Sequence, residues 1–465
     1  MPADARLVPS TAFLDGLRAQ TDRRRAAFTP LASPFAGADP AAESRVRAAA
    51  ALDREPVLAL ARDLHAHPEV AFGEVRSVGA VADLLARRGV RASVGSHGLG
   101  TSLRAGLSAA GPDDGAVRPD AGPTIAVLAE YDALPDVGHA CGHHLIAAAA
   151  TGAFLALHRA AADGLRFPGR LLLLGTPAEE GSSGKELLAR TGFFDGVDAA
   201  IMVHPFGYDV VDHPFLGRRQ LRVTYHGVAA HASASPFMGR NALDAVALHY
   251  QAVAMLRQHL PPSDRVHGIV VEGGERPSVV PERATVEYYL RSAHPATLRD
   301  LSGRLGDIAH GAALATGTRA ELEWDRAPFT LPVRTNAPLA ARWARHQATQ
   351  GRTALAGGVV PDILAASTDF GNVSVRLPGI HPMIAVGDPD VALHTRKFAR
   401  AAGGPAGDAA VVDGAVGLAL TALDYLLDPA LRAAVRQDFE DAGGVLDVPG
   451  YFVDPLTRTP EGDLT

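Results

Sequence analysis

Six residues, all cysteine, histidine or glutamate, follow the ends of expected strands and have the chemistry of a two-metal hydrolytic site. They lie in four short segments: His139-Ala-Cys141-Gly-His143, Pro177-Ala-Glu179-Glu180-Gly181, Val203-His204-Pro205 and Ala392-Leu393-His394. A thiolate, imidazoles and paired carboxylates at one sheet edge are what metal-assisted hydrolysis requires. No single segment is diagnostic, so the prediction depends on their convergence.

The first segment places Cys141 and His143 two apart across a glycine, a spacing that lets both side chains face one point in a turn. An alanine-rich helix is expected to begin just after them. Its N-terminal dipole, together with a metal ion, would lower the pKa of the thiol and favour the thiolate as a ligand. A buried structural cysteine beside a helix-capping histidine explains this segment alone equally well.

The second segment contains adjacent glutamates, Glu179 and Glu180. Neighbouring residues do not easily bind one metal in the same way, so the two carboxylates are expected to have different roles. One carboxylate would ligate, and the other would accept a proton from the attacking water. A solvated loop is the competing interpretation, but the position of the pair at a strand end, beside Pro177 and Gly181, makes it less favoured.

His204 ends an expected strand, and His394 lies in a loop after another. Taken alone, each is more often a structural histidine than a ligand. The chain has 19 histidines, so most must be non-ligands. His139 and His144 flank the site and are expected to be structural or to support the ligands.

The elements that must position these residues alternate between strand and helix. Compact apolar runs at residues 124–129, 170–175 and 199–203 predict buried strands, and residues 145–161 and 184–190 predict helices between them. This alternation indicates an α/β domain with a mostly parallel sheet flanked by helices. Sites in such sheets lie beyond the carboxyl ends of the strands, where the two glutamates and His204 fall.

A second pattern follows, with strands predicted near residues 220–226, 268–272, 284–291 and 319–324 and helices at 242–258 and 296–315. The β-α-β-β-α-β order predicts an inserted ferredoxin-like α+β domain that acts as a lid. We therefore divide the chain into an N-terminal arm (1–45), a catalytic domain in two parts (46–215 and 329–465, the latter with a C-terminal extension) and the lid (216–328).

Composition narrows the class of protein. The chain has 465 residues, is 47% hydrophobic and carries a net charge of −7, which argues against binding nucleic acid or an anionic membrane. A single cysteine excludes an intrachain disulfide framework and fits a reducing compartment. The N-terminus lacks a signal pattern, and the apolar runs look too short to span a membrane. These features predict a cytoplasmic protein.

Nine motifs along the chain carry a family resemblance. They are His67-Pro-Glu69, Glu130-Tyr-Asp132-Ala-Leu-Pro135, Gly138-His-Ala-Cys-Gly-His143, Pro177-Ala-Glu-Glu-Gly181, His204-Pro205, Gly227-Val-Ala-Ala-His231-Ala, Gly239-Arg-Asn241-Ala-Leu-Asp244, Ser367-Thr-Asp-Phe-Gly-Asn-Val-Ser374 and His394-Thr395. Together they resemble the aminoacylase and carboxypeptidase-G-type metallopeptidases, peptidase family M20. The likeness spans about residues 54–455 and is closest to the amidohydrolase branch, in the subgroup of aminobenzoyl-glutamate hydrolase and β-alanyl-lysine or Xaa-Arg dipeptidase.

The resemblance implies a metal-dependent amidohydrolase or dipeptidase with two divalent ions, zinc or manganese. It implies the following metal ligands: Cys141, His143, Glu180, His204 and His394. Glu179 becomes the general base, and Asp132 orients a ligand. In this family a lid histidine and asparagine reach the active site, the histidine often across a homodimer formed by the lid. Those positions match His231 and Asn241, and Arg291 becomes a candidate carboxylate clamp.

The implied substrate is a dipeptide or N-acyl amino acid with a free carboxylate. A dipeptide with a basic C-terminal residue ranks slightly ahead of aminobenzoyl-glutamate. The chain departs from the family at His144, where Asp or Asn is usual, and at Ser278, where Asn is usual. Two alternatives stay open: a non-catalytic or regulatory subunit of a heteromeric amidohydrolase, and a structural zinc protein.

Overall fold

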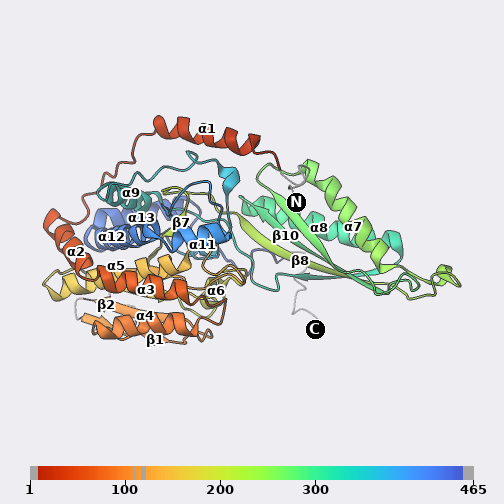
Figure 1. The fold of residues 1–465 in the computed structure, drawn as a ribbon, viewed down its shortest axis with the longest axis horizontal. Coiled ribbons are helices and arrows are strands. Elements are labelled where there is room, and N and C mark those ends of the chain that lie inside the picture. Colours follow the sequence, from red (N-terminus) through yellow and green to blue (C-terminus); the bar gives the residue numbers. More distant parts are fainter. Residues whose placement is uncertain (1–8, 109–110, 117–121, 454–465) are drawn as a thin grey trace, which may run out of the picture.

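The structure, a computed structural model, describes residues 9–108, 111–116 and 122–453, and it consists of a catalytic part and an elongated lid that projects from one side (Figure 1). The helices are α1 (Ala12–Ala26), α2 (Pro40–Leu52), α3 (Arg54–Ala66), α4 (Val75–Arg87), α5 (His143–Ala162), α6 (Gly184–Ala189), α7 (Ala242–Leu256), α8 (Pro295–Thr316), α9 (Ala337–Ala348), α10 (Phe370–Ser374), α11 (Arg396–Ala402), α12 (Pro405–Leu427) and α13 (Pro429–Asp441). The outermost residues of the predicted arm and C-terminal extension, 1–8 and 454–465, lie outside the described residues.

The catalytic part is built on a seven-stranded sheet with the order β1-β2-β5-β4-β6-β12, in which β3 also pairs with β2. Its strands are β1 (Ser93–Val94), β2 (Leu103–Ser108), β3 (Gly111–Asp113), β4 (Thr124–Ala129), β5 (Arg170–Gly175), β6 (Ala199–Ile201) and β12 (Gly379–Ile380). Strands β5, β4, β6 and β12 run parallel, whereas β2 is antiparallel to its three neighbours. The predicted α/β class is therefore confirmed, with an antiparallel edge added to the parallel strands.

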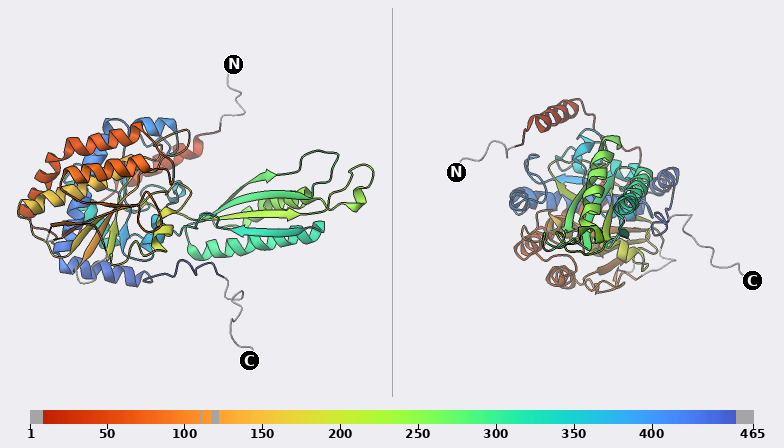
Figure 2. Two further views of the ribbon diagram at one scale, coloured as in Figure 1. Left: turned by 90° about the horizontal axis from the view of Figure 1, so that it is seen from below. Right: turned by 90° about the vertical axis from the view of Figure 1, so that its right-hand side faces the viewer.

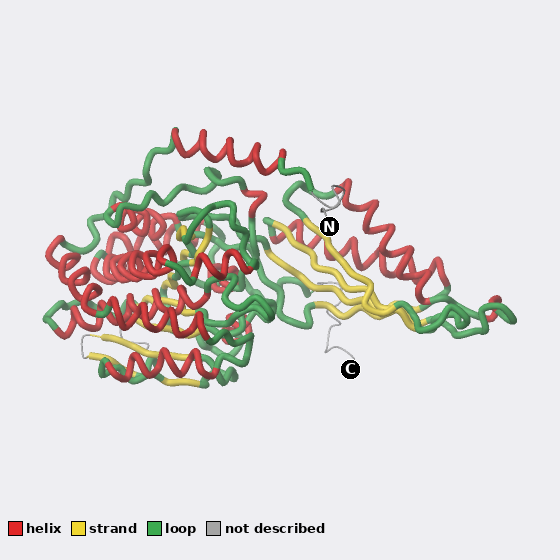
Figure 3. The backbone as a smooth tube through the Cα atoms, viewed as in Figure 1, coloured by secondary structure: helices red, strands yellow, loops and turns green. Residues whose placement is uncertain are grey.

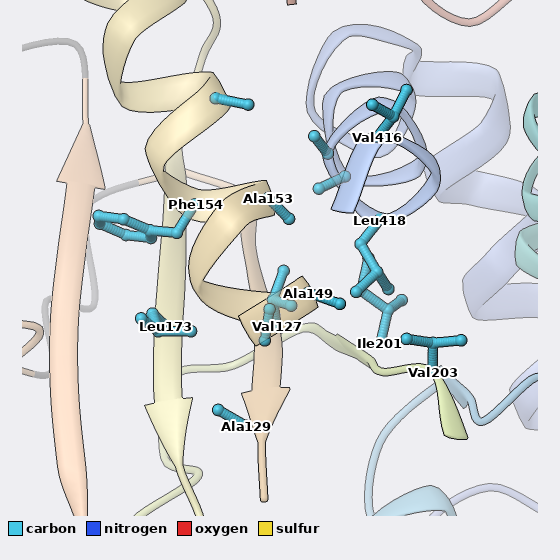
Figure 4. Close-up of a cluster of buried hydrophobic side chains, with 14 of the residues drawn as sticks. Val127, Ala129, Ala149, Ala153, Phe154, Leu173, Ile201, Val203, Val416 and Leu418 are labelled. Carbon is cyan, nitrogen blue, oxygen red and sulfur yellow. The ribbon is translucent and has the colours of Figure 1, made fainter. Parts of the chain in front are cut away.

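Alternate residues of the central strands face two separate cores. Val127, Leu173 and Ile201 pack under α5 and α12 in the larger core, where Ala149 and Leu418 meet them (Figure 4). The intervening residues pack on the other face against α6 and α10. Burial on both faces explains why these strands read in the sequence as continuous apolar runs.

Helices α5 and α12 are long and apolar enough, by length and composition, to cross a membrane. This corrects the expectation that no apolar segment approaches that length. Within the protein, however, 78% of the relevant window of α5 and 83% of that of α12 are buried against other elements. Core helices of this kind satisfy the same criteria, so the two helices are weak evidence for membrane insertion.

The lid contains β8 (Gly217–His226), β9 (Arg265–Glu272), β10 (Arg283–Ser292) and β11 (Arg319–Trp324) in a four-stranded antiparallel sheet. With α7 and α8 they follow the ferredoxin-like order β-α-β-β-α-β. One face of the sheet packs on the two helices, whereas the other carries polar and charged side chains. The strands run lengthwise from the catalytic part to loops at the far end (Figure 3).

The edges of the lid sheet are β9 and β11, since the order is β11-β8-β10-β9. Strand β8, which ends at His226, is therefore not an edge strand, because both of its sides are occupied by β10 and β11. Chain order did not reveal this, because β11 returns from the end of the lid to pair with its first strand.

The apolar spacing from about Arg45 to Ala66 suits one amphipathic helix, whereas the structure has two helices there, α2 and α3, separated at Asp53. Asp53 is buried, and its carboxylate accepts hydrogen bonds from Arg88 and Arg159. These long-range partners explain a break that local periodicity did not indicate. Helix α1 lies outside the main body of helices (Figures 1 and 2), and one of its contacts is an ion pair between Arg18 and Asp390 at 2.6 Å.

Candidate active site

Cys141 and His143 lie on the turn that enters α5. Gly142 between them has φ +84°, and a Cβ there would lie 2.8 Å from the ring of Pro205, so the turn requires glycine. The Cys141 Sγ lies 3.5 Å from Nε2 of His204, which follows β6 and begins the short strand β7 (His204–Phe206). β7 pairs with β13 (Met383–Ala385). Two segments that are distant in the sequence thus converge at one sheet edge.

The imidazole of His143 is oriented by Asp132. Its Nδ1 lies 2.9 Å from Asp132 Oδ1, and the other oxygen of Asp132 accepts a hydrogen bond from the backbone N–H of Glu180 at 2.8 Å. Burial favours the neutral carboxylic acid, but the charge and hydrogen bond of His143 outweigh it, and the pKa of Asp132 is lowered. Asp132 therefore directs Nε2 of His143 towards the cluster and positions the loop that carries Glu180.

Nε2 of His143 faces both glutamates, at 3.9 Å from Oε2 of Glu179 and 4.0 Å from Oε1 of Glu180. Nε2 of His394 lies 3.6 Å from the same Oε1 of Glu180. The ligand atoms form three overlapping groups, each within 4.8 Å: Cys141, His143 and His204; Cys141, Glu180 and His394; and His143, Glu179 and Glu180. The six residues singled out in the sequence are thus in one place.

This donor set fits divalent cations. Among the described residues, three buried atoms of the site have no hydrogen-bond partner: Nε2 of His143, Oε1 of Glu180 and Oε2 of Glu130. Burying an unpaired polar atom lowers the stability of the fold, unless a bound ligand such as a metal ion interacts with it. Among protein groups alone, burial and then the charge of Glu180 raise the pKa of the Cys141 thiol, contrary to the effect expected of the helix dipole. A cation is therefore needed for Cys141 to act as a thiolate.

Glu179 lies in an environment suited to a proton acceptor. Burial raises its pKa well above the ordinary carboxyl value, and the charges of Glu130, Asp369 and Glu180 raise it further. A carboxylate with a raised pKa accepts a proton more readily, which suits a general base.

A buried lysine beneath the site was not identified from the sequence. Lys185 donates to carboxylate oxygens of Glu130 and Asp369, and its backbone N–H donates to the second oxygen of Asp369 at 2.8 Å. All three side chains are buried. One signal was present: Lys185 is one of only two lysines among 44 Lys and Arg residues, which suggests a need for a compact ammonium group there.

His139 and His144 pack against each other and belong to none of the three groups of candidate ligand atoms. Their rings lie 4.8 Å apart between centroids, and the His144 ring lies 4.8 Å from that of His65. Both are buried, and burial first, then neighbouring histidines, lower the pKa of each. The departure at His144 therefore places a buried imidazole ring between those of His65 and His139.

Arg291 lines the same cavity as Glu179, Glu180 and His394. Arg218, which the sequence did not single out, lines it too. The lid thus contributes two cationic side chains to a cavity whose other wall carries the candidate metal ligands.

His231 and Asn241 are not brought to this cavity within one chain. His231 is exposed in a loop beyond the far end of β8, and its Nδ1 accepts a hydrogen bond from the N–H of Ala234. Asn241 caps α7 by accepting from the N–H of Leu243 at 2.9 Å. Since β8 starts beside the cavity, its ten residues separate that loop from the site by roughly 30 Å.

Comparison with known proteins agrees with this geometry. Residues 126–401 match the family described as Peptidase family M20/M25/M40. The chain belongs to this family. It is 37% identical to a mouse (Mus musculus) Xaa-Arg dipeptidase over 85% of this chain and 91% of that protein. It is 30% identical to a p-aminobenzoyl-glutamate hydrolase subunit from Escherichia coli over 83% of this chain and 92% of that protein.

Two solved structures share this fold. A dinuclear metal-binding peptidase of the M20 family from Bacillus subtilis aligns over 80% of this chain and 98% of its own chain, with a TM-score of 0.58 and 20% identity. An aminobenzoyl-glutamate utilization protein from Klebsiella pneumoniae aligns over 80% of this chain and 96% of its own chain, with a TM-score of 0.60 and 21% identity. The M20 chain described here is therefore a hydrolase of peptide or amide C–N bonds with a site for divalent metals.

Proposed function

We propose that this M20 hydrolase holds two divalent ions, zinc or manganese, and cleaves the amide bond of a dipeptide or N-acyl amino acid with a free carboxylate. The observation that carries the proposal is the set of three overlapping groups of ligand atoms, each within 4.8 Å. The proposed ligands are Cys141, His143, Glu180, His204 and His394. Thiolate, imidazole and carboxylate donors suit zinc, and the carboxylates also suit manganese.

The metal ions, when bound, polarise the scissile carbonyl and acidify the attacking water. Glu179 accepts the proton of that water and later donates a proton to the leaving amine. Asp132 keeps His143 in one tautomer and orientation through its bond to Nδ1. The Glu179 side chain is only 10% exposed, which restricts competing solvent at the base.

The position of Arg291 favours a substrate that has a free carboxylate. It lines the cavity that contains Glu179 and, among the described residues, is in no ion pair that would neutralise it. A guanidinium group can bind a carboxylate through two parallel hydrogen bonds. The relatives named for Xaa-Arg dipeptides and for p-aminobenzoyl-glutamate both point to amides with a terminal amino acid.

A hydrolysis screen of the zinc- and manganese-loaded protein tests this substrate class. Dipeptides, N-acetyl amino acids and aminobenzoyl-glutamate would be compared with the same compounds blocked as carboxamides. Blocking should lower kcat/KM by about 10- to 100-fold, because a charge-assisted hydrogen bond to Arg291 is lost. Equal kcat/KM for free and blocked forms across the active substrates would refute the role of Arg291.

A non-catalytic or regulatory subunit is the alternative function, since one relative carries the name of a subunit. The retention of Glu179 beside Glu180 favours the enzyme, because a metal site without chemistry does not need a spare carboxylate. Elemental analysis should find about two divalent ions per chain. One tightly held zinc would favour a structural site instead.

We further propose a homodimer paired through the lid, in which His231 and Asn241 of each chain serve the partner's site. The separation of roughly 30 Å within one chain supports this arrangement. Mixing Glu179→Gln chains with His231→Ala chains leaves one intact site in each mixed dimer. Activity should recover to about a quarter of wild type at random pairing, as measured by turnover after verified subunit exchange. Absence of recovery in a verified mixed dimer would exclude a shared site.

A further inference from the structure

Arg218 and Arg291 lie directly opposite each other in the lid sheet. They are paired residues of the antiparallel strands β8 and β10, so both side chains project from the same face. That face is the one turned away from α7 and α8, and both arginines line the cavity with Glu179 and Glu180. Two cations thus stand side by side at the mouth of the candidate site.

Neither Arg218 nor Arg291 takes part in an ion pair among the residues that the structure describes. The neighbouring arginines of β8 behave differently: Arg219 pairs with Asp325 at 2.6 Å, and Arg222 pairs with Glu287 at 3.5 Å. Directly opposed like charges are unfavourable. The lid therefore neutralises its other β8 arginines and leaves these two for an external anion.

Arg218 is held in place by neutral oxygens of the catalytic loop. Its Nη2 lies 3.2 Å from Oγ of Ser183 and 3.4 Å from the carbonyl oxygen of Gly181. Gly181 directly follows Glu180, so the guanidinium group is tied to the loop that carries the proposed base and ligand. The centre of the Tyr289 ring lies 5.3 Å from Cζ of Arg218 and 5.9 Å from Cζ of Arg291. The ring therefore makes cation–π contacts with both guanidinium groups.

The acidic residues of the lid loops that could attract a basic side chain lie outside this cavity. Glu272, Glu275 and Glu282 line a separate pocket together with Arg276 and Arg283. Within the active-site cavity, Asp369 is engaged by Lys185. The lid side of the cavity therefore presents positive charge to a bound substrate.

We propose that Arg218 is a specificity-determining residue that binds a second carboxylate of the substrate, so that the preferred leaving amino acid is glutamate or aspartate. Arg291 binds the α-carboxylate, and Arg218 binds the side-chain carboxylate. This inference rests on the proposed function, and it reverses the ranking of basic over acidic C-terminal residues drawn from the sequence. The expected substrates are N-acyl or aminoacyl derivatives of dicarboxylic amino acids.

The test compares N-acyl-glutamate with the neutral isostere N-acyl-glutamine and with N-acyl-arginine. In the wild-type protein, kcat/KM for the glutamate compound should exceed that for the glutamine compound by about 10- to 100-fold, the value of a charge-assisted hydrogen bond. Arg218→Met should reduce this ratio to near one while hydrolysis of the glutamine compound persists. Arg218→Lys should restore part of the preference, because the charge is kept. Arg222→Met, on the same strand face outside the cavity, is the matched control and should keep the wild-type ratio.

A binding measurement separates this inference from the proposed function. Calorimetry on metal-loaded Glu179→Gln protein compares the affinity for N-acyl-glutamate and N-acyl-glutamine without turnover. Tighter binding of the glutamate compound, lost in Glu179→Gln/Arg218→Met, supports the inference. Equal binding, or tighter binding of N-acyl-arginine, overturns it. If no amide is hydrolysed yet the binding preference is present, the proposed function fails and the dicarboxylate site stands. Hydrolysis without a glutamate preference overturns the specificity alone.

Discussion

Glu179→Gln is expected to lower kcat by about 10²- to 10⁴-fold, the usual contribution of a general base. Glutamine keeps the size of the side chain but cannot accept the proton of the attacking water. Metal content should remain at the wild-type value, because the proposed ligands next to Glu179 are unchanged. These are Glu180, His143 and His394. The measurement is steady-state turnover together with elemental analysis of the same preparation.

Glu180→Gln provides the contrast to this variant. It removes the carboxylate charge that lies 3.6 Å from His394 and 4.0 Å from His143, so metal content and turnover should fall together. Near-normal turnover of fully loaded Glu179→Gln protein would show that another group accepts the proton. Loss of metal from Glu179→Gln would show that Glu179 is a ligand instead.

Lys185→Met is expected to destabilise the protein by about 3–5 kcal/mol, because it removes one partner of a buried ionic network. Glu130 and Asp369 would remain charged, buried and without their cation. The free energy of unfolding, measured by urea denaturation, should fall by that amount. Lys397→Met is the matched control: Lys397 is the only other lysine and is exposed, so its loss should change stability by less than about 0.5 kcal/mol.

A second substitution tests whether the loss of stability in Lys185→Met comes from the carboxylates left without their cation. Adding Glu130→Gln to Lys185→Met removes one of the two uncompensated charges, and this should recover part of the lost stability. A Lys185→Met protein within about 1 kcal/mol of wild type would show that the carboxylates take up protons or rearrange at little cost.

Local patterns were sufficient for most of the framework. Apolar runs such as Thr124–Ala129 and Arg170–Gly175 correspond to β4 and β5, because a strand buried on both faces must be continuously apolar. The ligand candidates were found because side chains at the carboxyl ends of parallel strands meet at one edge. Residue type then indicated the chemistry, since few sets other than Cys, His and Glu bind metals of this kind.

Features that depend on partners distant in the chain were decided only by the tertiary structure. Lys185 reads as an ordinary helix residue until Glu130 and Asp369, which are far away in sequence, are seen beside it. Arg218 becomes a site residue only because antiparallel pairing places it opposite Arg291.

The sequence by itself therefore determined the element types, the strand ends and the kinds of ligand, because these depend on neighbours within a few residues. Strand order, register and the pairing of buried charges depend on contacts between residues far apart along the chain, which periodicity does not encode. For this reason the convergence of the candidate ligands was predictable, whereas the interior position of β8, the lysine network and the paired arginines emerged only from the fold.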